Sequence, residues 1–351
     1  MLNMRIGNEI TKVQTDIINE TVECFPDKTE FSIALIENNK VNFFGVKKHK
    51  GSIVNINNQI SFFKIGSITK LFTSTILSNL VIKNGIKLND TIDSFLPFSI
   101  NNNEKITLLS LANHTSGISN YPFDIDFDEN TLENPLAHFN ENQLVTYLQK
   151  ELTIEPSKKN SVSYSNLGFV ILGYILENIE NKKYHELIDQ YVFSKYNMHT
   201  SSLRKDKIKG KLVPGLDKNG KEIALWENIT FDPAGETTFS SVLELSKFVI
   251  NQFDGSNKIL NLTKKATFSR DEKIDVGLGW AIHKNEDNTK YHFHPGGLRG
   301  FRSCLVINEI NKTGVIVLSN VSCFHEKSIT VNQLCFDLIA TLNKNEPLTQ
   351  V

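Results

Sequence analysis

Three short patterns in the sequence could do chemistry together, and the first is Ser67-Ile-Thr-Lys70. Ser67 follows a predicted strand and begins an apolar helix, so its hydroxyl should lie at the helix N-terminus. Lys70 is one turn further on, on the same helix face. A serine hydroxyl is a weak nucleophile until a neighbour accepts its proton, and a lysine can accept it only where burial or a nearby cation lowers its pKa. The pattern therefore predicts either an activated nucleophile in a desolvated site or an ordinary serine N-cap.

The Ser-x-x-Lys spacing occurs twice more, and context argues against both further pairs. Ser61 and Lys64 lie on a predicted strand, where an odd offset points side chains to opposite faces. Ser202 and Lys205 run into a polar stretch that is typical of a solvated loop. The pair at the helix start is therefore the candidate.

The second pattern is Tyr164-Ser-Asn166, placed just before a predicted helix. One interpretation is a helix start in which Ser165 or Asn166 serves as the N-cap. The functional alternative makes Tyr164 a proton shuttle and Asn166 an amide that orients the lysine and a substrate.

The third pattern is His294-Pro-Gly296-Gly297, between two predicted strands. Proline has no amide hydrogen to donate, so residues 291–297 should form an edge strand where a substrate could dock. A cationic His294 would lower the pKa of Lys70, whereas the simpler alternative is a histidine satisfied by one hydrogen bond. A zinc site made with His283 and His292 is a weaker rival, so no metal is expected.

Periodicity predicts the elements that must position these residues. Apolar residues at helical spacing predict helices, and short β-branched or aromatic runs between turn residues predict strands. The expected helices are 6–22, 67–85, 106–113, 141–151, 166–180, 183–195, 240–253 and 329–342, and the expected strands are 30–37, 41–47, 60–64, 277–283, 291–294, 301–308 and 314–320.

This order predicts an α+β fold, with one antiparallel β-sheet made by both chain ends and flanked by the N- and C-terminal helices. An all-α domain would be inserted between the two halves of the sheet. The expected division is 1–65 plus 272–351 for the sheet domain and 66–271 for the helical insertion. The active site is expected in the cleft between them.

Composition excludes several classes of protein. The chain has 351 residues, of which 40% are hydrophobic and 22% charged, so it should fold throughout. Its 38 Lys+Arg and 39 Asp+Glu nearly balance, which argues against nucleic acid as a partner. No apolar stretch is long enough to span a bilayer, and the first twenty residues lack a leader-like apolar core. These features predict a cytoplasmic protein, or a periplasmic or secreted one if a signal was removed.

Taken in order, Ser67-Ile-Thr-Lys70, Tyr164-Ser-Asn166 and His294-Pro-Gly296 resemble the S-x-x-K, Y-x-N and (K/H)-(T/S)-G motifs of the serine β-lactamase and penicillin-binding-protein superfamily. The pattern is most similar to class C β-lactamases, DD-carboxypeptidases and related esterases. Residues 63–73, 108–117, 277–280 and 300–303 also resemble that superfamily. The resemblance implies the β-lactamase/transpeptidase-like fold.

The resemblance also implies a serine hydrolase that works through an acyl-enzyme, without a cofactor. Ser67 would attack the carbonyl of a small ester, D-amino-acid amide or peptide, or β-lactam, while Lys70 and Tyr164 exchange the proton. Asn166 would hold the substrate and help to position Lys70. The backbone N–H groups of Ser67 and Gly297 would form the oxyanion hole. The alternative is a non-catalytic or weakly catalytic binding or sensor protein, and the oligomeric state stays open.

Two residues of this sequence differ from the motifs of that superfamily, and both differences bear on which substrate is preferred. Pro295 replaces the usual hydroxyl residue, and Glu236 stands where a second glycine is common. Arg299, or alternatively Arg302, could supply a lost contact to a substrate carboxylate, and Gly296 is expected to contact the substrate. His114, in the segment Asn-His-Thr-Ser-Gly117, is expected to have only a structural role and to hydrogen-bond locally.

Overall fold

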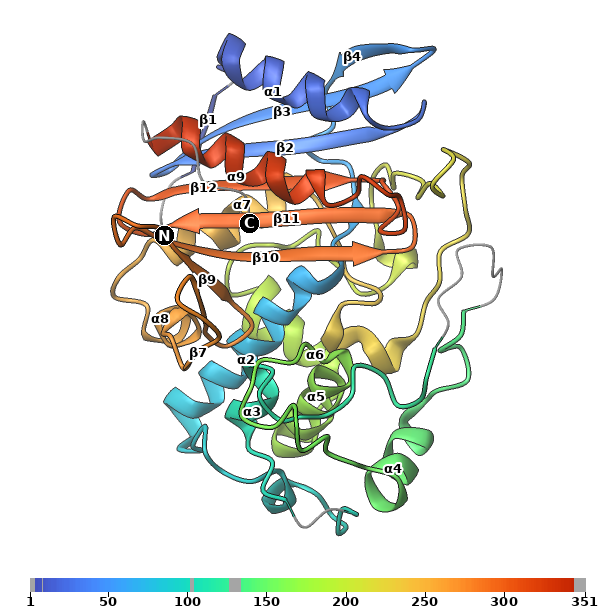
Figure 1. Cartoon of the computed structure of the whole chain (residues 1–351), viewed down its shortest axis with the longest axis vertical. Coiled ribbons are helices and arrows are strands. Elements are labelled where there is room, and N and C mark those ends of the chain that lie inside the picture. Colours follow the sequence, from blue (N-terminus) through green and yellow to red (C-terminus); the bar gives the residue numbers. More distant parts are fainter. Residues whose placement is uncertain (1–3, 8, 102–103, 126–133, 344–351) are drawn as a thin grey trace.

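One ten-stranded sheet contains strands from both ends of the chain (Figure 1). The computed structural model describes residues 4–7, 9–101, 104–125 and 134–343. The strands run in the order β1-β3-β2-β12-β11-β10-β9-β8-β7, with β4 paired to β3. All pairs are antiparallel except β1 with β3. The bounds are Arg5–Gly7 (β1), Glu30–Glu37 (β2), Lys40–His49 (β3), Ser52–Ile56 (β4), Phe268–Ser269 (β7), Ile274–Val276 (β8), Ala281–Lys284 (β9), Lys290–Leu298 (β10), Phe301–Asn308 (β11) and Thr313–Ser319 (β12).

The central strands are buried on both faces because two cores sandwich the sheet. Successive side chains of a strand point to opposite faces. On β12, Val315 and Val317 belong to one core, and Ile316 and Leu318 belong to the other. The first core lies under the terminal helices α1 (Lys12–Glu23) and α9 (Thr330–Asn343), which cover the outer face of the sheet. The predicted α+β fold with flanking terminal helices is confirmed.

The second core joins the sheet to a helical region. Its helices are α2 (Thr69–Asn84), α3 (Leu108–Ala112), α4 (Glu141–Lys150), α5 (Asn166–Glu180), α6 (Tyr184–Ile188), α7 (Val242–Gln252) and α8 (Lys258–Lys264). Residues 69–80 of α2 are buried without interruption, as expected for a helix that is surrounded by protein. Among the described helices, none combines the length and the hydrophobicity needed to cross a bilayer.

The N-terminal helix differs from the prediction of a helix over 6–22. It begins at Lys12, where Thr11 and Gln14 form a capping box, while Arg5–Gly7 pairs with β3. Ile6 and Val13 are exposed, so their helical spacing does not reflect burial.

Several other predicted helices and strands differ from the observed ones. In place of a strand over 277–283, β8 and β9 flank a turn in which Gly279 has φ +73°. The predicted strand 60–64 shrinks to β5 (Phe63–Lys64), which pairs with β6 (Phe239–Ser240) outside the main sheet. The helix expected over 183–195 continues from α6 as a π-helical turn, Asp189–Phe193. β4 and α8 were not predicted.

The proposed domain division, 1–65 plus 272–351 against 66–271, stays a prediction. Two features blur its boundary: β7 belongs to the main sheet although it precedes residue 272, and α7 packs on β2 and β12.

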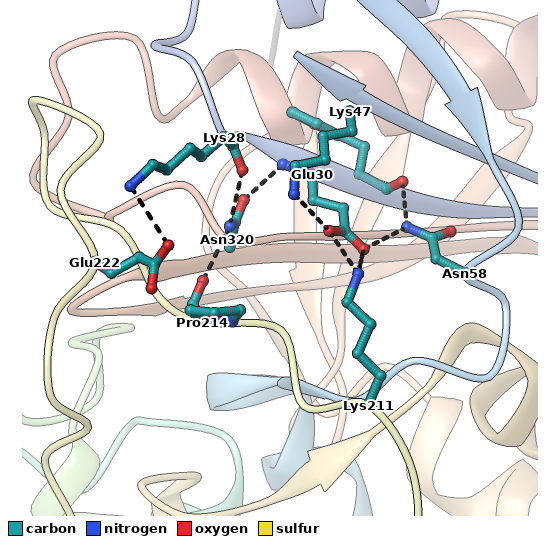
Figure 2. A network of polar contacts seen from close by, with 9 residues as sticks. Lys28, Glu30, Lys47, Asn58, Lys211, Pro214, Glu222 and Asn320 are labelled. Carbon is teal, nitrogen blue, oxygen red and sulfur yellow. Dashed lines mark hydrogen bonds and ion pairs between the residues drawn. The ribbon is translucent and has the colours of Figure 1, made fainter. Parts of the chain in front are cut away.

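A buried polar network ties the segment 211–216 to the end of the sheet. Glu30 is 1% exposed, and Figure 2 shows its carboxylate accepting hydrogen bonds from Lys211 Nζ (2.8 and 2.9 Å) and Asn58 Nδ2 (3.2 Å). The Glu30 amide donates to Asn320 Oδ1 (2.7 Å), and Asn320 Nδ2 donates to the Pro214 carbonyl (2.9 Å). A buried charge needs such partners because its desolvation is costly.

Lys211→Met should therefore lower the free energy of unfolding by about 1–3 kcal/mol, because it leaves Glu30 with Lys47 3.9 Å away as its nearest cation. Urea unfolding measures the effect. The control is Lys207→Met, which breaks a pair with Asp206 whose side chains are both exposed and should cost less than about 0.5 kcal/mol. Equal losses in the two variants would contradict a stabilising role for the network.

Candidate active site

Ser67 lies in a one-turn 3-10 helix, Gly66–Ile68, that leads directly into α2. Backbone contacts hold this turn against the segment around Gly235. The strand β5, just before the turn, pairs with β6, and the Ile65 amide donates a hydrogen bond to the Thr238 carbonyl (3.0 Å). Gly235 packs so closely that a Cβ there would lie 2.2 Å from the Gly66 carbonyl oxygen and 3.0 Å from the Ser67 nitrogen. The nucleophile candidate is thus held by backbone contacts that require glycine.

Lys70 is fully buried and reaches Ser67. Its Nζ donates to Ser67 Oγ (3.0 Å), Asn166 Oδ1 (2.7 Å) and the Ala234 carbonyl (2.7 Å). Burial holds the pKa of Lys70 well below its usual value, and the charge of Glu236 opposes this only in part. An amine with a lowered pKa can accept a proton near neutral pH, which the sequence argument required of this lysine.

Tyr164 approaches the same hydroxyl from another element. Its OH donates to Ser67 Oγ (2.7 Å) from the extended segment before α5. Desolvation raises the pKa of Tyr164, although the residue as a whole is 43% exposed. The phenol therefore carries its proton at neutral pH, and the Lys70 amine, with its lowered pKa, is the neighbour of Ser67 that can accept a proton.

Asn166 is oriented by residues that the sequence analysis missed. Its Nδ2 donates to Asn120 Oδ1 (3.0 Å) and Tyr121 OH (3.1 Å), and its backbone N–H also donates to Asn120 Oδ1 (2.9 Å). These bonds turn Asn166 Oδ1 toward Lys70. Neither partner belongs to a recognisable spacing, so no sequence signal pointed to them.

The third motif borders the same turn, but its edge-strand prediction is only half right. β10 pairs with β9 over residues 290–293 and with β11 over residues 292–298, so its C-terminal part, residues 294–298, has a paired strand on one side only. That part lies beside the turn before α2. A Cβ on Gly296 would lie 2.2 Å from the Ile65 carbonyl oxygen, and one on Gly66 would lie 3.0 Å from the Gly297 nitrogen. Gly296 and Gly297 therefore lie beside Ser67.

His294 does not supply the expected cation. It is buried, and its Nδ1 lies 2.7 Å from the Pro295 carbonyl. Burial and the nearby Lys70 lower the pKa of His294 to about 3, so the ring is neutral at pH 7. The lowered pKa of Lys70 comes from burial instead.

This neutral histidine predicts a pH-dependent stability. Its folded pKa of about 3 lies below the ordinary value of 6.5, so between these values the unfolded chain binds a proton that the folded chain does not. The stabilising contribution is complete above about pH 6.5 and is lost as pH falls, with a slope of at most about 1.4 kcal/mol per pH unit. Urea unfolding between about pH 7.5 and pH 5 should show a smaller slope for His294→Phe than for the wild type. The exposed control, His49→Phe, should keep the wild-type slope, and equal slopes for all three proteins would refute the assignment.

The remaining candidates lie around this centre. The Arg299 guanidinium lies 4.8 Å from the ring centroid of Trp226. Arg302 faces Gly297 across the β10–β11 ladder, and a Cβ on Gly297 would lie 2.9 Å from Arg302 Nη1. The Arg302 side chain therefore lies close to the Gly297 backbone.

The two rejected Ser-x-x-Lys pairs have other partners. Lys64 is buried, donates to the Trp226 carbonyl (2.5 Å) and lies 3.8 Å from the Glu236 carboxylate. Lys205 is exposed in a short 3-10 turn. Across the described ranges, no three His, Cys, Asp or Glu side chains are grouped to hold a metal ion, so the zinc alternative with His283 and His292 has no support.

The comparisons identify the family. The beta-lactamase family model matches residues 18–333, and the chain therefore belongs to the beta-lactamase family. Protein flp of Staphylococcus aureus (strain MW2) is 26% identical over 277 residues, which are 74% of this chain and 53% of that protein. The chain thus spans about half the length of the curated relatives it matches.

Solved structures agree on the fold. The octameric penicillin-binding protein homologue from Pyrococcus abyssi aligns with a TM-score of 0.75 at 21% identity, over 96% of this chain and 78% of that one. A class C beta-lactamase from Rhodobacter sphaeroides aligns with a TM-score of 0.75 at 15% identity, over 95% and 100%. The chain has the β-lactamase/transpeptidase-like fold.

Proposed function

We propose that this protein is a serine hydrolase that acts through an acyl-enzyme on Ser67. The observation that carries the proposal is the Ser67 hydroxyl, which is contacted at once by the buried Lys70 amine and the Tyr164 phenol. Ser67 Oγ forms the bond to the carbonyl carbon and passes its proton to Lys70, with Tyr164 sharing the exchange as part of a coupled pair. The proton then goes to the leaving group, and water later releases the acyl group from Ser67.

The oxyanion that forms on the carbonyl needs donors. We assign this role to the backbone N–H groups of Ser67 and Gly297, which lie on either side of the close contact between Gly66 and β10. A preorganised donor of this kind contributes about 3 kcal/mol to the transition state. Asn166 holds the substrate amide or ester, Gly296 lines the substrate path, and the neutral ring of His294 lies near Tyr164, at 6.4 Å between ring centroids.

The substrate class is a small carbonyl compound: an ester, a D-amino-acid amide or peptide, or a β-lactam. Pro295 removes a hydroxyl donor beside the oxyanion site, which weakens the case for substrates that need it. Arg302 Nη1 would lie 2.9 Å from a Cβ on Gly297, whereas the Arg299 guanidinium lies over the Trp226 ring, so Arg302 is our preferred candidate for contact with a substrate carboxylate.

A panel of chromogenic esters, D-aminoacyl anilides and nitrocefin, assayed with wild type and Ser67→Ala, tests the proposal. We expect turnover of at least one class by the wild type and its loss in Ser67→Ala. Covalent labelling of Ser67 without turnover of any class would indicate a binding protein that retains the nucleophile. Equal turnover by both proteins would refute the proposal.

A further inference from the structure

His114 contacts three consecutive residues of the chain around Tyr164. Its carbonyl accepts a hydrogen bond from the Ser163 amide (2.8 Å), and its Nδ1 accepts one from the Ser165 amide (3.1 Å). Between these bonds, its ring lies on the Tyr164 ring, with centroids 4.5 Å apart and planes 35° apart. From the sequence, His114 was expected to bond only locally, but these partners lie about fifty residues away along the chain.

Tyr164 needs support of this kind because burial does not hold it. The residue as a whole is 43% exposed, and it directly precedes Ser165, the extended N-cap residue of α5. The direction of its hydroxyl toward Ser67 therefore depends on what lies behind the ring. His114 fills that space, and Phe169 backs His114 in turn with ring centroids 5.1 Å apart.

The same rings surround the buried amine. Lys70 Nζ lies 4.9 Å from the centroid of the Tyr164 ring and 5.6 Å from that of Phe169. A shift of the Tyr164 ring would therefore disturb both groups that reach the Ser67 hydroxyl.

The conformation of His114 is itself specialised. Its φ is +61°, which is uncommon for a residue other than glycine, and the side chain is buried. Because Nδ1 accepts the Ser165 N–H, the proton of the neutral ring is on Nε2, and a protonated ring would set two N–H groups against each other. Burial, Lys70 and His294 all lower the pKa of His114, which keeps the ring in this neutral form.

We propose that His114 is a positioning residue for acyl transfer: by binding the residues on either side of Tyr164 and stacking on its ring, it aims the Tyr164 hydroxyl at Ser67 Oγ. This inference rests on the proposed function but goes beyond it, because none of the three motifs includes His114. A histidine that only stabilised its turn would change stability without a specific effect on the rate.

Two substitutions separate the contacts of His114. His114→Phe keeps an aromatic ring and loses the acceptor, whereas His114→Asn keeps an acceptor, tolerates positive φ and loses the ring. We expect each to lower kcat on a p-nitrophenyl ester, and the rate of labelling by a fluorophosphonate, about 10- to 100-fold. KM should change less than about threefold, since substrate binding does not use His114.

The matched control is His292→Phe. His292 is also buried, with one bond from its ring to the Lys264 carbonyl (3.1 Å) and an aromatic contact to Trp280 (6.1 Å). The His292→Phe substitution should lower the Tm as His114→Phe does, but its kcat should stay within about threefold of the wild-type value. In a Tyr164→Phe background, His114→Phe should add little further loss, because both substitutions act on the same hydroxyl.

Labelling of the wild type separates the two claims. If Ser67 of the wild type is not labelled and no ester is turned over, the proposed function fails and this inference fails with it. If the wild type is labelled but His114→Phe reacts within threefold of it, or the two losses simply add in the double variant, only the positioning role is overturned. Should His114→Phe not fold, His114→Asn decides by the same criteria.

Discussion

Lys70→Met should lower kcat/KM about a thousandfold, because it removes the proton acceptor from the Ser67 hydroxyl while keeping a long, unbranched side chain in a buried position. Lys70 is fully buried and its amine bonds to Ser67, Asn166 and the Ala234 carbonyl. Ester hydrolysis and the rate of fluorophosphonate labelling measure the loss.

The control for this prediction is Lys264→Met. Lys264 is another buried lysine whose pKa burial lowers, and it bonds to the Gln252 carbonyl (2.5 Å) and to Glu309, neither of which contacts Ser67 or Lys70 through a hydrogen bond. Its loss should reduce stability but leave kcat/KM within about threefold. A tenfold or smaller loss in Lys70→Met, or an equal loss in both variants, would show that Lys70 is not the proton acceptor.

Gly235→Ala should lower the free energy of unfolding by about 3 kcal/mol and also slow acylation. Gly235 has φ +110°, which side chains rarely adopt, and a Cβ there would lie 2.2 Å from the Gly66 carbonyl. Strain at φ costs about 1–3 kcal/mol and the steric clash adds to it. Because the clash falls on the residue before Ser67, the nucleophile must move as the chain relaxes.

Urea unfolding and the labelling rate measure both parts of this prediction. Gly255→Ala is the matched control, since a Cβ at Gly255 would meet no atom within 4 Å. It should change stability by less than about 0.5 kcal/mol and leave labelling unchanged. If Gly235→Ala were as stable and as reactive as Gly255→Ala, the close packing on Gly66 would not be what positions Ser67.

The parts of the fold that could be predicted are those in which burial and local capping agree. β2, β11 and β12 are largely apolar strands buried on both faces, and α5 begins directly after its N-cap Ser165 and ends before Asn181 as its pattern indicates. The errors lie where spacing and burial disagree. The helical spacing of Ile6 and Val13 outweighed the Thr11–Gln14 capping box, which marked the true start of α1.

The residues of the site also fall into those that the sequence predicts and those that it does not. Ser67, Lys70, Tyr164 and Asn166 carry side-chain chemistry at fixed spacing, and the structure brings them together. The Ala234 carbonyl is a backbone group, which leaves no mark in a motif, and Asn120 is one asparagine among many. The charge of His294 could not be predicted because its pKa depends on burial, which only the folded chain defines.

The central claim is that Ser67 is the nucleophile, and intact-mass spectrometry after fluorophosphonate treatment tests it most directly. The account predicts one adduct per chain, mapped by peptide sequencing to Ser67, with no adduct on Ser67→Ala under the same conditions. An adduct on another residue, or labelling of Ser67→Ala at the wild-type rate, would contradict the account.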